Sequence, residues 1–154
     1  MEIQINNRQR LVKLNQESIR TIVRTILKTE TKKKYSDNFE ISLNFVRDKA
    51  IQEINKKYLG KDSPTDVISF SMIEGELSSL YPDILGDVFI SSETAIRQAQ
   101  EYKFDLNSEM ILYIVHGVLH LLKYDDIDPQ KRKIMKRKER YYLKKFKLLK
   151  LIKV

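Results

Sequence analysis

The 154-residue chain contains neither cysteine nor tryptophan, and it has only four glycines and three prolines. Without cysteine, disulfide bonds, zinc–thiolate sites and cysteine nucleophiles are excluded. No repeat or low-complexity linker divides the chain, and 42% hydrophobic residues are enough for one domain with a core. We therefore predict a single domain over residues 1–154, in which residues 129–154 form a basic C-terminal helix.

We expect neither a targeting segment nor a membrane-spanning segment in this sequence. The N-terminus lacks the basic block and the following apolar block of a signal peptide. The longest apolar run, residues 110–122, is too short to cross a bilayer. We expect a cytoplasmic protein with no membrane partner.

Acidic residues are nearly absent from the end of the chain. After Asp128 there are twelve Lys or Arg and one acid, Glu139, which gives this segment +11 and leaves −3 of the total +8 for residues 1–128. Interleaved aromatic residues suit a polyanion such as RNA. A lysine-rich solvated helix face explains the same pattern equally well.

Hydrophobic periodicity predicts both strands and helices. We expect strands over residues 2–6, 39–46, 66–71 and 85–90, and helices over 16–31, 48–58, 92–102, 109–122 and from Pro129 onward. Asn107 or Ser108 is expected to cap the fourth helix, and residues 74–82 to form a loop. The fold class is α+β: a mixed sheet of about four strands covered by helices.

The helix expected over 109–122 is apolar on nearly every face and carries the only two histidines, His116 and His120. Four residues make about one helical turn, so both imidazoles would project from one face. Asp126 follows six residues later and could complete a three-ligand site with an open position, as in catalytic zinc centres. If the turn uses a positive φ at position 123, glycine would adopt it more easily; Lys123 then either tolerates a strained backbone or indicates a different turn.

The histidine pair alone is a loose pattern, because helical histidines more often satisfy local hydrogen bonds than bind metal. Asp125 and Asp126 could likewise be turn residues. Burial favours the metal site, since two imidazoles within an apolar helix need polar partners.

Further motifs accompany the pair in a fixed order: residues 55–62 (NKKYLGKD), 64–70 (PTDVISF), 85–90 (LGDVFI) and 116–125 (HGVLHLLKYD), with Gln98-Ala99, Glu109 and Val115. Together they resemble the YbeY family of bacterial rRNA-maturation endoribonucleases, over roughly residues 50–128. In that family a third histidine stands where this chain has Asp126.

The resemblance implies one zinc ion and single-strand-specific RNA cleavage in 16S rRNA 3′-end maturation and ribosome quality control. By position, the metal ligands would be His116, His120 and Asp126. The implied partner is rRNA or the ribosomal subunit, with a ribosomal protein as a further candidate. For contacts to the RNA backbone we expect the basic residues Lys57, Lys61, Lys131, Arg132, Lys136 and Arg137.

Two positions depart from the family pattern. Asp126 lowers the charge of the site and should make bound water less acidic than three histidines would. Two histidines and a carboxylate also match a non-haem iron(II) site, so Fe²⁺ or another divalent ion is an alternative to zinc. Leu59 replaces a family arginine that would clamp phosphate; Lys57 or Lys61 would substitute only as point charges.

Gly117 stands where zinc proteases place a glutamate base, which argues against proteolysis. For RNA, the metal ion could activate water for attack on phosphate, or polarise the phosphate while the 2′-hydroxyl attacks. Thr65, Asp66 and Ser69 are weaker candidates for lining the cleft. Asp87 is a candidate either for turn formation or for accepting a hydrogen bond from a metal-bound imidazole.

The sequence therefore predicts a zinc-dependent endoribonuclease, a hydrolase, with no catalytic residue assigned beyond the metal ligands. The alternative is a non-catalytic ribosome-assembly factor that binds rRNA and whose metal is structural or absent. A metal-dependent hydrolase of another substrate is the third possibility.

Overall fold

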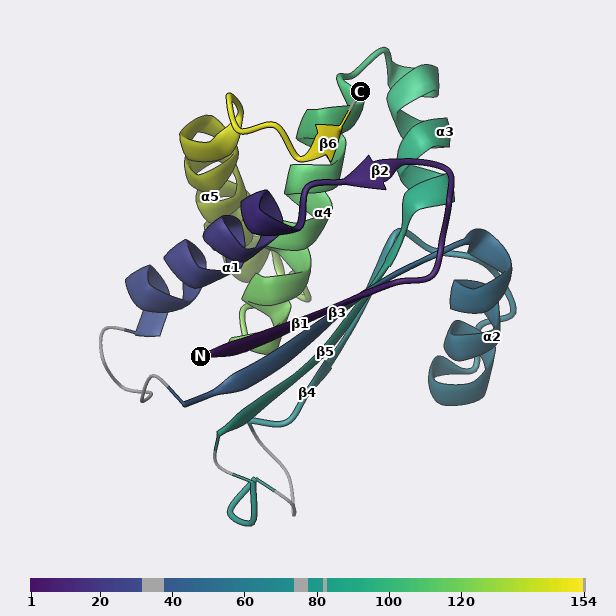
Figure 1. Ribbon diagram of the computed structural model, residues 1–154. Helices are drawn as coiled ribbons and strands as arrows, with labels where there is room; N and C mark the ends of the chain where they lie inside the picture. The colour runs from purple at the N-terminus through teal and green to yellow at the C-terminus, as the bar shows by residue number, and fades with distance from the viewer. Residues whose placement is uncertain (32–37, 74–77, 82, 154) are drawn as a thin grey trace.

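A four-stranded mixed sheet with helices on both faces organises the chain, as expected for the α+β class (Figure 1). The computed structural model describes residues 1–31, 38–73, 78–81 and 83–153. Along the chain these contain β1 (Glu2–Asn7), β2 (Lys13–Leu14), α1 (Gln16–Thr31), β3 (Glu40–Val46), α2 (Asp48–Leu59), β4 (Val67–Ser71), β5 (Ile84–Ser91), α3 (Ser92–Tyr102), α4 (Leu106–Leu121), α5 (Pro129–Phe146) and β6 (Ile152–Lys153).

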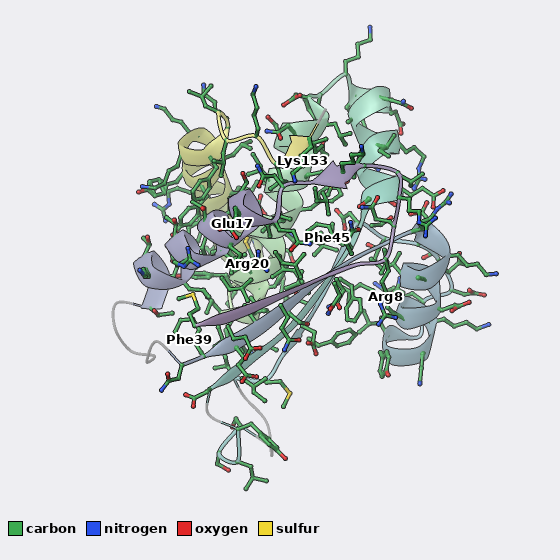
Figure 2. All side chains as sticks on the ribbon, in the orientation of Figure 1. Arg8, Glu17, Arg20, Phe39, Phe45 and Lys153 are labelled. Carbon is green, nitrogen blue, oxygen red and sulfur yellow. The ribbon has the colours of Figure 1, made fainter. Side chains whose placement is uncertain are left out.

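The strand order is β1-β3-β5-β4, and only the last pair is antiparallel. Alternation along β3 sends Ile41, Leu43 and Phe45 into the main core, whereas Ser42 and Asn44 point to the other face. Phe39, just before β3, and Phe45 within it are both buried (Figure 2). Among the described residues, β4 pairs only with β5, so the outer edge of β4 is open.

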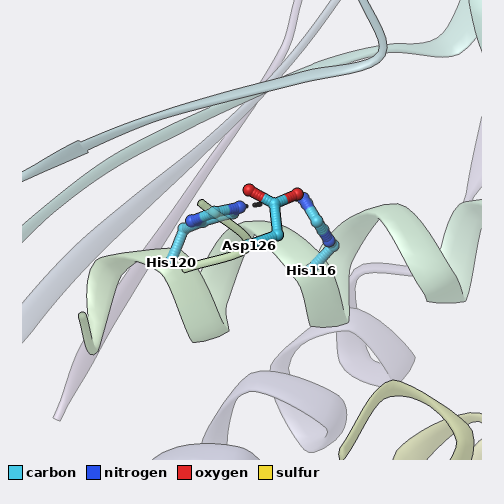
Figure 3. A group of neighbouring side chains, drawn as sticks. All are labelled: His116, His120 and Asp126. Carbon is cyan, nitrogen blue, oxygen red and sulfur yellow. Dashed lines mark hydrogen bonds between the residues drawn. The ribbon is translucent and has the colours of Figure 1, made fainter. Parts of the chain in front are cut away.

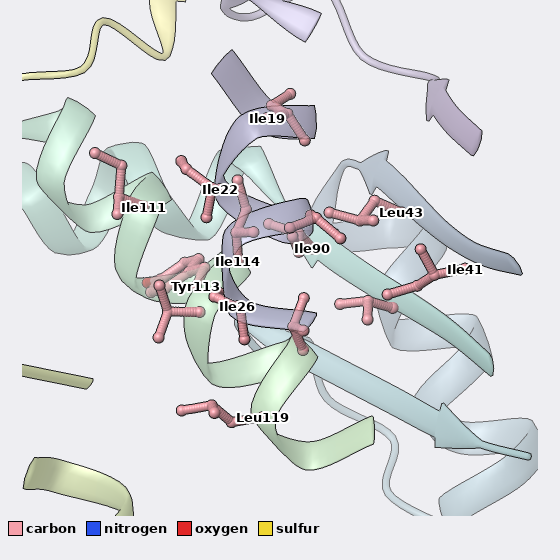
Figure 4. Packing of buried hydrophobic residues seen from close by; sticks show 14 of the residues in the cluster. Ile19, Ile22, Ile26, Ile41, Leu43, Ile90, Ile111, Tyr113, Ile114 and Leu119 are labelled. Atoms are coloured by element: carbon pink, nitrogen blue, oxygen red, sulfur yellow. The ribbon is translucent and has the colours of Figure 1, made fainter. Parts of the chain in front are cut away.

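Helix α4 lies at the centre of the molecule, between the sheet and the helices α1 and α5 (Figures 1 and 4). Its buried side chains, including Ile111, Ile114 and Leu119, pack against α1 and the sheet in one apolar cluster. A helix buried on most sides must be apolar all round, which is the pattern in its sequence. Gly117 permits the close approach to the sheet, because a Cβ there would lie 2.5 Å from Cγ1 of Val88.

Helix α2 covers the opposite face of the sheet near β4. Val46, Ile51 and Ile68 form a second, smaller core there, with Phe70 and Phe89 packed against it. Successive side chains of β4 therefore alternate between α4 and α2. This alternation makes β4 the boundary between two different surfaces.

Two expectations need correction. Asp105, rather than Asn107 or Ser108, caps α4: its carboxylate accepts from the Ser108 amide at 3.1 Å. Asn107 instead accepts from the Leu151 amide at 2.7 Å and so anchors the C-terminal segment.

The basic helix ends at Phe146 and does not continue to the end of the chain. The following residues turn back, and β6 pairs antiparallel with β2. This two-residue ladder was not predicted, because it joins segments from opposite ends of the chain. Of the loop expected over 74–82, residues 74–77 and 82 lie outside the described residues.

Within the described ranges, no helix combines the length and the apolar character needed to cross a membrane.

Candidate metal centre and adjoining groove

His116 and His120 project from one face of α4, and the carboxylate of Asp126 turns back toward both rings (Figure 3). The two Nε2 atoms are 2.9 Å apart. One ligand atom from each of the three residues lies within 4.8 Å of the others. Both imidazoles are half-buried and the aspartate is exposed. The three residues that the sequence singles out are therefore brought together, with their ligand atoms facing a common point.

The turn after α4 brings Asp126 to this point. Lys123 adopts φ +75°, so of the two alternatives it tolerates the strained backbone. The Tyr124 amide donates to the Leu119 carbonyl at 3.1 Å, which closes the turn. A non-glycine residue in this conformation costs roughly 1 kcal/mol or more, which the surrounding structure must offset.

Glu139 of α5 is a further part of the site, which the sequence interpretation missed. Nδ1 of His116 donates to its carboxylate. This contact places the proton of the neutral ring on Nδ1 and leaves Nε2, which faces His120 and Asp126, free to bind a cation. The available signal was the single acid in an otherwise basic segment.

The two rings differ in their electrostatic environments. Burial lowers the pKa of His116, but the hydrogen bond and the charge of Glu139 outweigh it, so that this pKa is raised above its usual value. Burial and the neighbouring His116 lower the pKa of His120. A proton shared by the pair is therefore favoured on His116.

This donor set fits a divalent cation. Imidazole nitrogen and carboxylate oxygen are ligands for zinc and for iron(II). In tetrahedral zinc sites, ligand atoms lie roughly 3.3 Å apart, close to the spacing between the histidines. With the His116 proton on Nδ1, the hydrogen bond between the two facing Nε2 atoms is donated by His120 and accepted by His116. A cation bound between them would be held by both lone pairs.

Two hollows meet at this centre, and Val67, His116 and Asp126 line both. The α5 hollow, about 300 Å³, is lined by Asp66, Val67, Gln98, Glu109, Leu112, Tyr113, His116, Asp126, Arg132, Met135, Lys136 and Glu139. The β4 hollow, about 690 Å³, is lined by Asn55, Leu59, Lys61, Thr65, Val67, Ile68, Ser69, Phe70, Ser71, His116, His120, Lys123 and Asp126.

The two hollows differ in charge. Burial and the nearby Asp66 raise the pKa of Glu109 in the α5 hollow, where acids outnumber bases. In the β4 hollow, Lys61 and Lys123 face a single acid, Asp126. The groove formed by both hollows is thus more cationic along β4.

The basic residues expected to contact RNA are dispersed. Arg132 and Lys136 line the α5 hollow and Lys61 the β4 hollow, beside Leu59 at the position of the family arginine. Lys131 pairs with Asp125 at 3.6 Å.

Two further basic residues lie outside the groove. Lys57 lies over the Tyr58 ring, and Arg137 is exposed on α5, away from the linings of both hollows. Of the two proposed substitutes for the missing arginine, only Lys61 reaches the groove.

Of the weaker candidates, Thr65 and Ser69 line the β4 hollow and Asp66 lines the α5 hollow, as expected, and each also has a local contact. The Ser69 hydroxyl donates to the Gly117 carbonyl at 2.8 Å and so ties β4 to α4. Thr65 donates to Asp66 at 3.2 Å. Asp87 lies within β5 and accepts from Ser42, so neither expectation for it holds. Glu139 accepts the hydrogen bond from the imidazole instead.

Comparisons with known proteins agree with this arrangement. Residues 4–147 match the family described as Endoribonuclease YbeY. The chain is 44% identical over 142 residues to Endoribonuclease YbeY of Syntrophus aciditrophicus (strain SB), covering 90% of this chain and 86% of the relative. It is 39% identical over 144 residues to Endoribonuclease YbeY of Finegoldia magna, covering 94% and 93%.

The fold is similar to the solution structure of TM1509 from Thermotoga maritima. The TM-score is 0.62 at 24% identity, over 92% of this chain and 87% of that one. Motifs, fold and sequence relatives lead to one conclusion: the chain belongs to the YbeY family.

Proposed function

We propose that this chain is an endoribonuclease that cleaves single-stranded RNA at a divalent cation held by His116, His120 and Asp126. The observation that carries the proposal is the convergence of these three residues inside a groove, in a chain of the YbeY family. Zinc is the metal proposed first, with iron(II) as the alternative for this donor set. A bound cation would polarise a phosphate and stabilise charge that develops during cleavage.

The protein's own groups position the substrate. Lys61 and Lys123 line the β4 hollow, where they would attract a phosphate, and Arg132 and Lys136 line the α5 hollow. Glu139 holds the ring of His116 in one orientation. The two hollows share Val67, His116 and Asp126, so an extended single strand could pass through both across the centre.

We further propose that the physiological substrate is the 3′ end of the 16S rRNA precursor, with the ribosomal subunit as partner and ribosome quality control as the wider role. This substrate is implied by the family resemblance, and we place the protein in the cytoplasm on the same basis. Accumulation of unprocessed 16S 3′ ends in cells that carry only the Asp126→Asn variant would support it. Normal processing in those cells would contradict it.

The adjacent acids Asp126 and Asp125 provide a matched test of the metal centre. We expect Asp126→Asn to lower metal content and cleavage of single-stranded RNA at least tenfold, because it removes a charged ligand. Asp125→Asn makes the same charge change outside the ligand group and should retain most of both. Metal content is measured by elemental analysis and cleavage on single-stranded and duplex RNA of one sequence.

The outcomes separate the proposal from its alternative. Asp126→His should restore or increase cleavage if the aspartate is a weakened ligand. Cleavage that survives chelation and Asp126→Asn would contradict metal catalysis. RNA binding without cleavage in the metal-loaded wild type would favour the assembly factor, which Leu59 and Asp126 make the second candidate.

A further inference from the structure

A third hollow, on the face of the sheet opposite α4, is lined mainly by aromatic rings. Its walls are Ile54 and Tyr58 of α2, Phe70 of β4, and Asp87 and Phe89 of β5, around about 340 Å³. This volume is within the range of about 300–1,000 Å³ for small-molecule sites. We call it the aromatic hollow. The metal centre makes no use of it, although Tyr58, Phe70, Asp87 and Phe89 all belong to the motifs 55–62, 64–70 and 85–90.

The rings meet edge to face. Tyr58 and Phe70 have centroids 5.4 Å apart at 69°, and Phe70 and Phe89 lie 5.9 Å apart at 80°. None of the three rings is stacked face to face with another. A flat group could therefore lie against the face of one of them. Tyr58 is 60% exposed, so its ring is accessible to a ligand from solvent.

The charges around the hollow suit a nucleotide. Nζ of Lys57 lies 5.3 Å from the centroid of the Tyr58 ring, close enough to meet the phosphate of a nucleotide stacked on that ring. Asp87 contributes an exposed carboxylate held by the Ser42 hydroxyl. A carboxylate accepts hydrogen bonds from the amino group of a base such as cytosine.

The aromatic hollow adjoins the groove of the metal centre. Phe70 lines both the aromatic hollow and the β4 hollow, and the successive residues Tyr58 and Leu59 line one each. The open edge of β4 lies between them. An extended strand in the β4 hollow could therefore turn one base over this edge into the aromatic hollow.

We propose that the aromatic hollow binds one unpaired nucleobase of single-stranded RNA, stacked against Tyr58 and facing Asp87. The proposal rests on the proposed function, because it places the base on the same strand that reaches the metal centre. Stacking on aromatic side chains is a general means of binding single strands, and it requires no base pairing to be broken.

The test measures binding by the full chain under conditions without cleavage. Wild-type protein is titrated with a short oligo(C) and with an abasic oligonucleotide of the same length and charge. We expect Tyr58→Ala to weaken oligo(C) binding roughly tenfold and to leave abasic binding unchanged. Tyr58→Trp should retain the preference for oligo(C).

Tyr102→Ala is the matched control, because Tyr102 is 57% exposed and lies on α3, away from this hollow. It should bind both oligonucleotides as the wild type does. Equal binding of the two oligonucleotides by the wild type, or an equal loss for both in Tyr58→Ala, would overturn the proposal. So would competition by an apolar peptide but not by a mononucleotide.

Asp87→Asn adds a test of base choice. An amide both donates and accepts, so the preference for oligo(C) over oligo(U) should fall toward one. An unchanged preference would overturn the role of Asp87. If the protein shows these binding differences but does not cleave RNA, the proposed activity is contradicted and the base-binding proposal is not. The two outcomes can be distinguished because binding is measured without cleavage.

Discussion

At the scale of single residues, the candidate centre depends on contacts around the ligands as much as on the ligands. Asp126 reaches the histidines only because Lys123 accepts a positive φ. His116 presents Nε2 to the site only because Glu139 holds its Nδ1 proton. Groups that orient metal-binding imidazoles in this way generally matter to affinity nearly as much as the ligands themselves.

We therefore predict that Glu139→Gln weakens metal binding about 10- to 100-fold while the fold is retained. The amide has nearly the same shape but is a weaker acceptor, and it can also present a donor to Nδ1. Competition with a chromophoric chelator measures the affinity, and circular dichroism checks the fold. Glu101→Gln, on an exposed part of α3, serves as the control. Equal metal affinity in wild type and Glu139→Gln would show that the contact does not orient the ring.

At the scale of elements, the spacing between α4 and the sheet sets the width of the site. The Ser69 and Ser71 hydroxyls of β4 donate to the Gly117 and Leu121 carbonyls at 2.8 and 2.9 Å. These contacts require a helix without a side chain at position 117. A Cβ there would also lie 3.0 Å from Cγ1 of Val67.

Gly117→Ala should consequently destabilise the protein by about 1–3 kcal/mol, since the helix or the sheet must shift. Gly60→Ala is the comparison: an added Cβ meets nothing within 4 Å, and only the strain of φ +71° opposes it. That strain costs about 1–2 kcal/mol and leaves the site intact. Urea denaturation measures both variants, and metal affinity should fall only in Gly117→Ala. Unchanged affinity there would mean that β4 does not set the geometry of the ligands.

At the scale of the whole molecule, Glu30 joins three distant parts of the chain. From the end of α1, its carboxylate accepts from Nζ of Lys138 at 2.7 Å, from the Tyr124 hydroxyl at 2.8 Å and from the Tyr142 hydroxyl. Its side chain is only 8% exposed. Tyr124 belongs to the turn that carries Asp126, and Lys138 is next to Glu139. Glu30 thus fixes the parts of the chain that supply two groups of the site.

The stability that Glu30 contributes should depend on pH. Burial raises its pKa, but the hydrogen bonds from Lys138, Tyr142 and Tyr124 outweigh it and hold the pKa below the usual 4.5. A lowered pKa in the folded state stabilises the protein above the unfolded-state value, and this contribution is lost as the pH falls through the folded-state pKa. Glu30→Gln should therefore lower the free energy of unfolding by about 3 kcal/mol at pH 7. Below pH 4.5 the difference in this free energy between the variant and the wild type should shrink. Unfolding free energies at several pH values measure it, and a difference independent of pH would contradict the ionic role.

The tertiary structure also decides which basic side chains of α5 are paired with acids and which line the groove. Lys138 is occupied by Glu30 and Lys131 by Asp125, whereas Arg132 and Lys136 face the groove. In the sequence these residues form a single run of basic side chains, which a solvated helix face and an RNA contact explain equally well. In the folded helix, some of these basic residues form ion pairs within the protein and others line the groove.

Most of the elements could be predicted from local pattern, because alternation and helical periodicity report directly which side chains are buried. The expected helix over 16–31 matches α1, and the strand expected over 66–71 nearly matches β4. Prediction from local sequence was wrong where the partner of a residue is distant along the chain. Asn107 accepts a hydrogen bond from the C-terminal segment instead of capping α4. Pairing of β2 with β6 has no local signal at all.

The sequence by itself determined the family, the α+β class and the three candidate ligands, because these depend on residue types at fixed spacing along one helix and its following turn. Only the tertiary structure decided the rest: Glu139 as partner of His116, Lys61 in the groove and Lys57 outside it, and three aromatic rings around one hollow. These residues are brought together by the packing of α2, β4, β5 and α5, and no periodicity along the chain records which elements pack against one another.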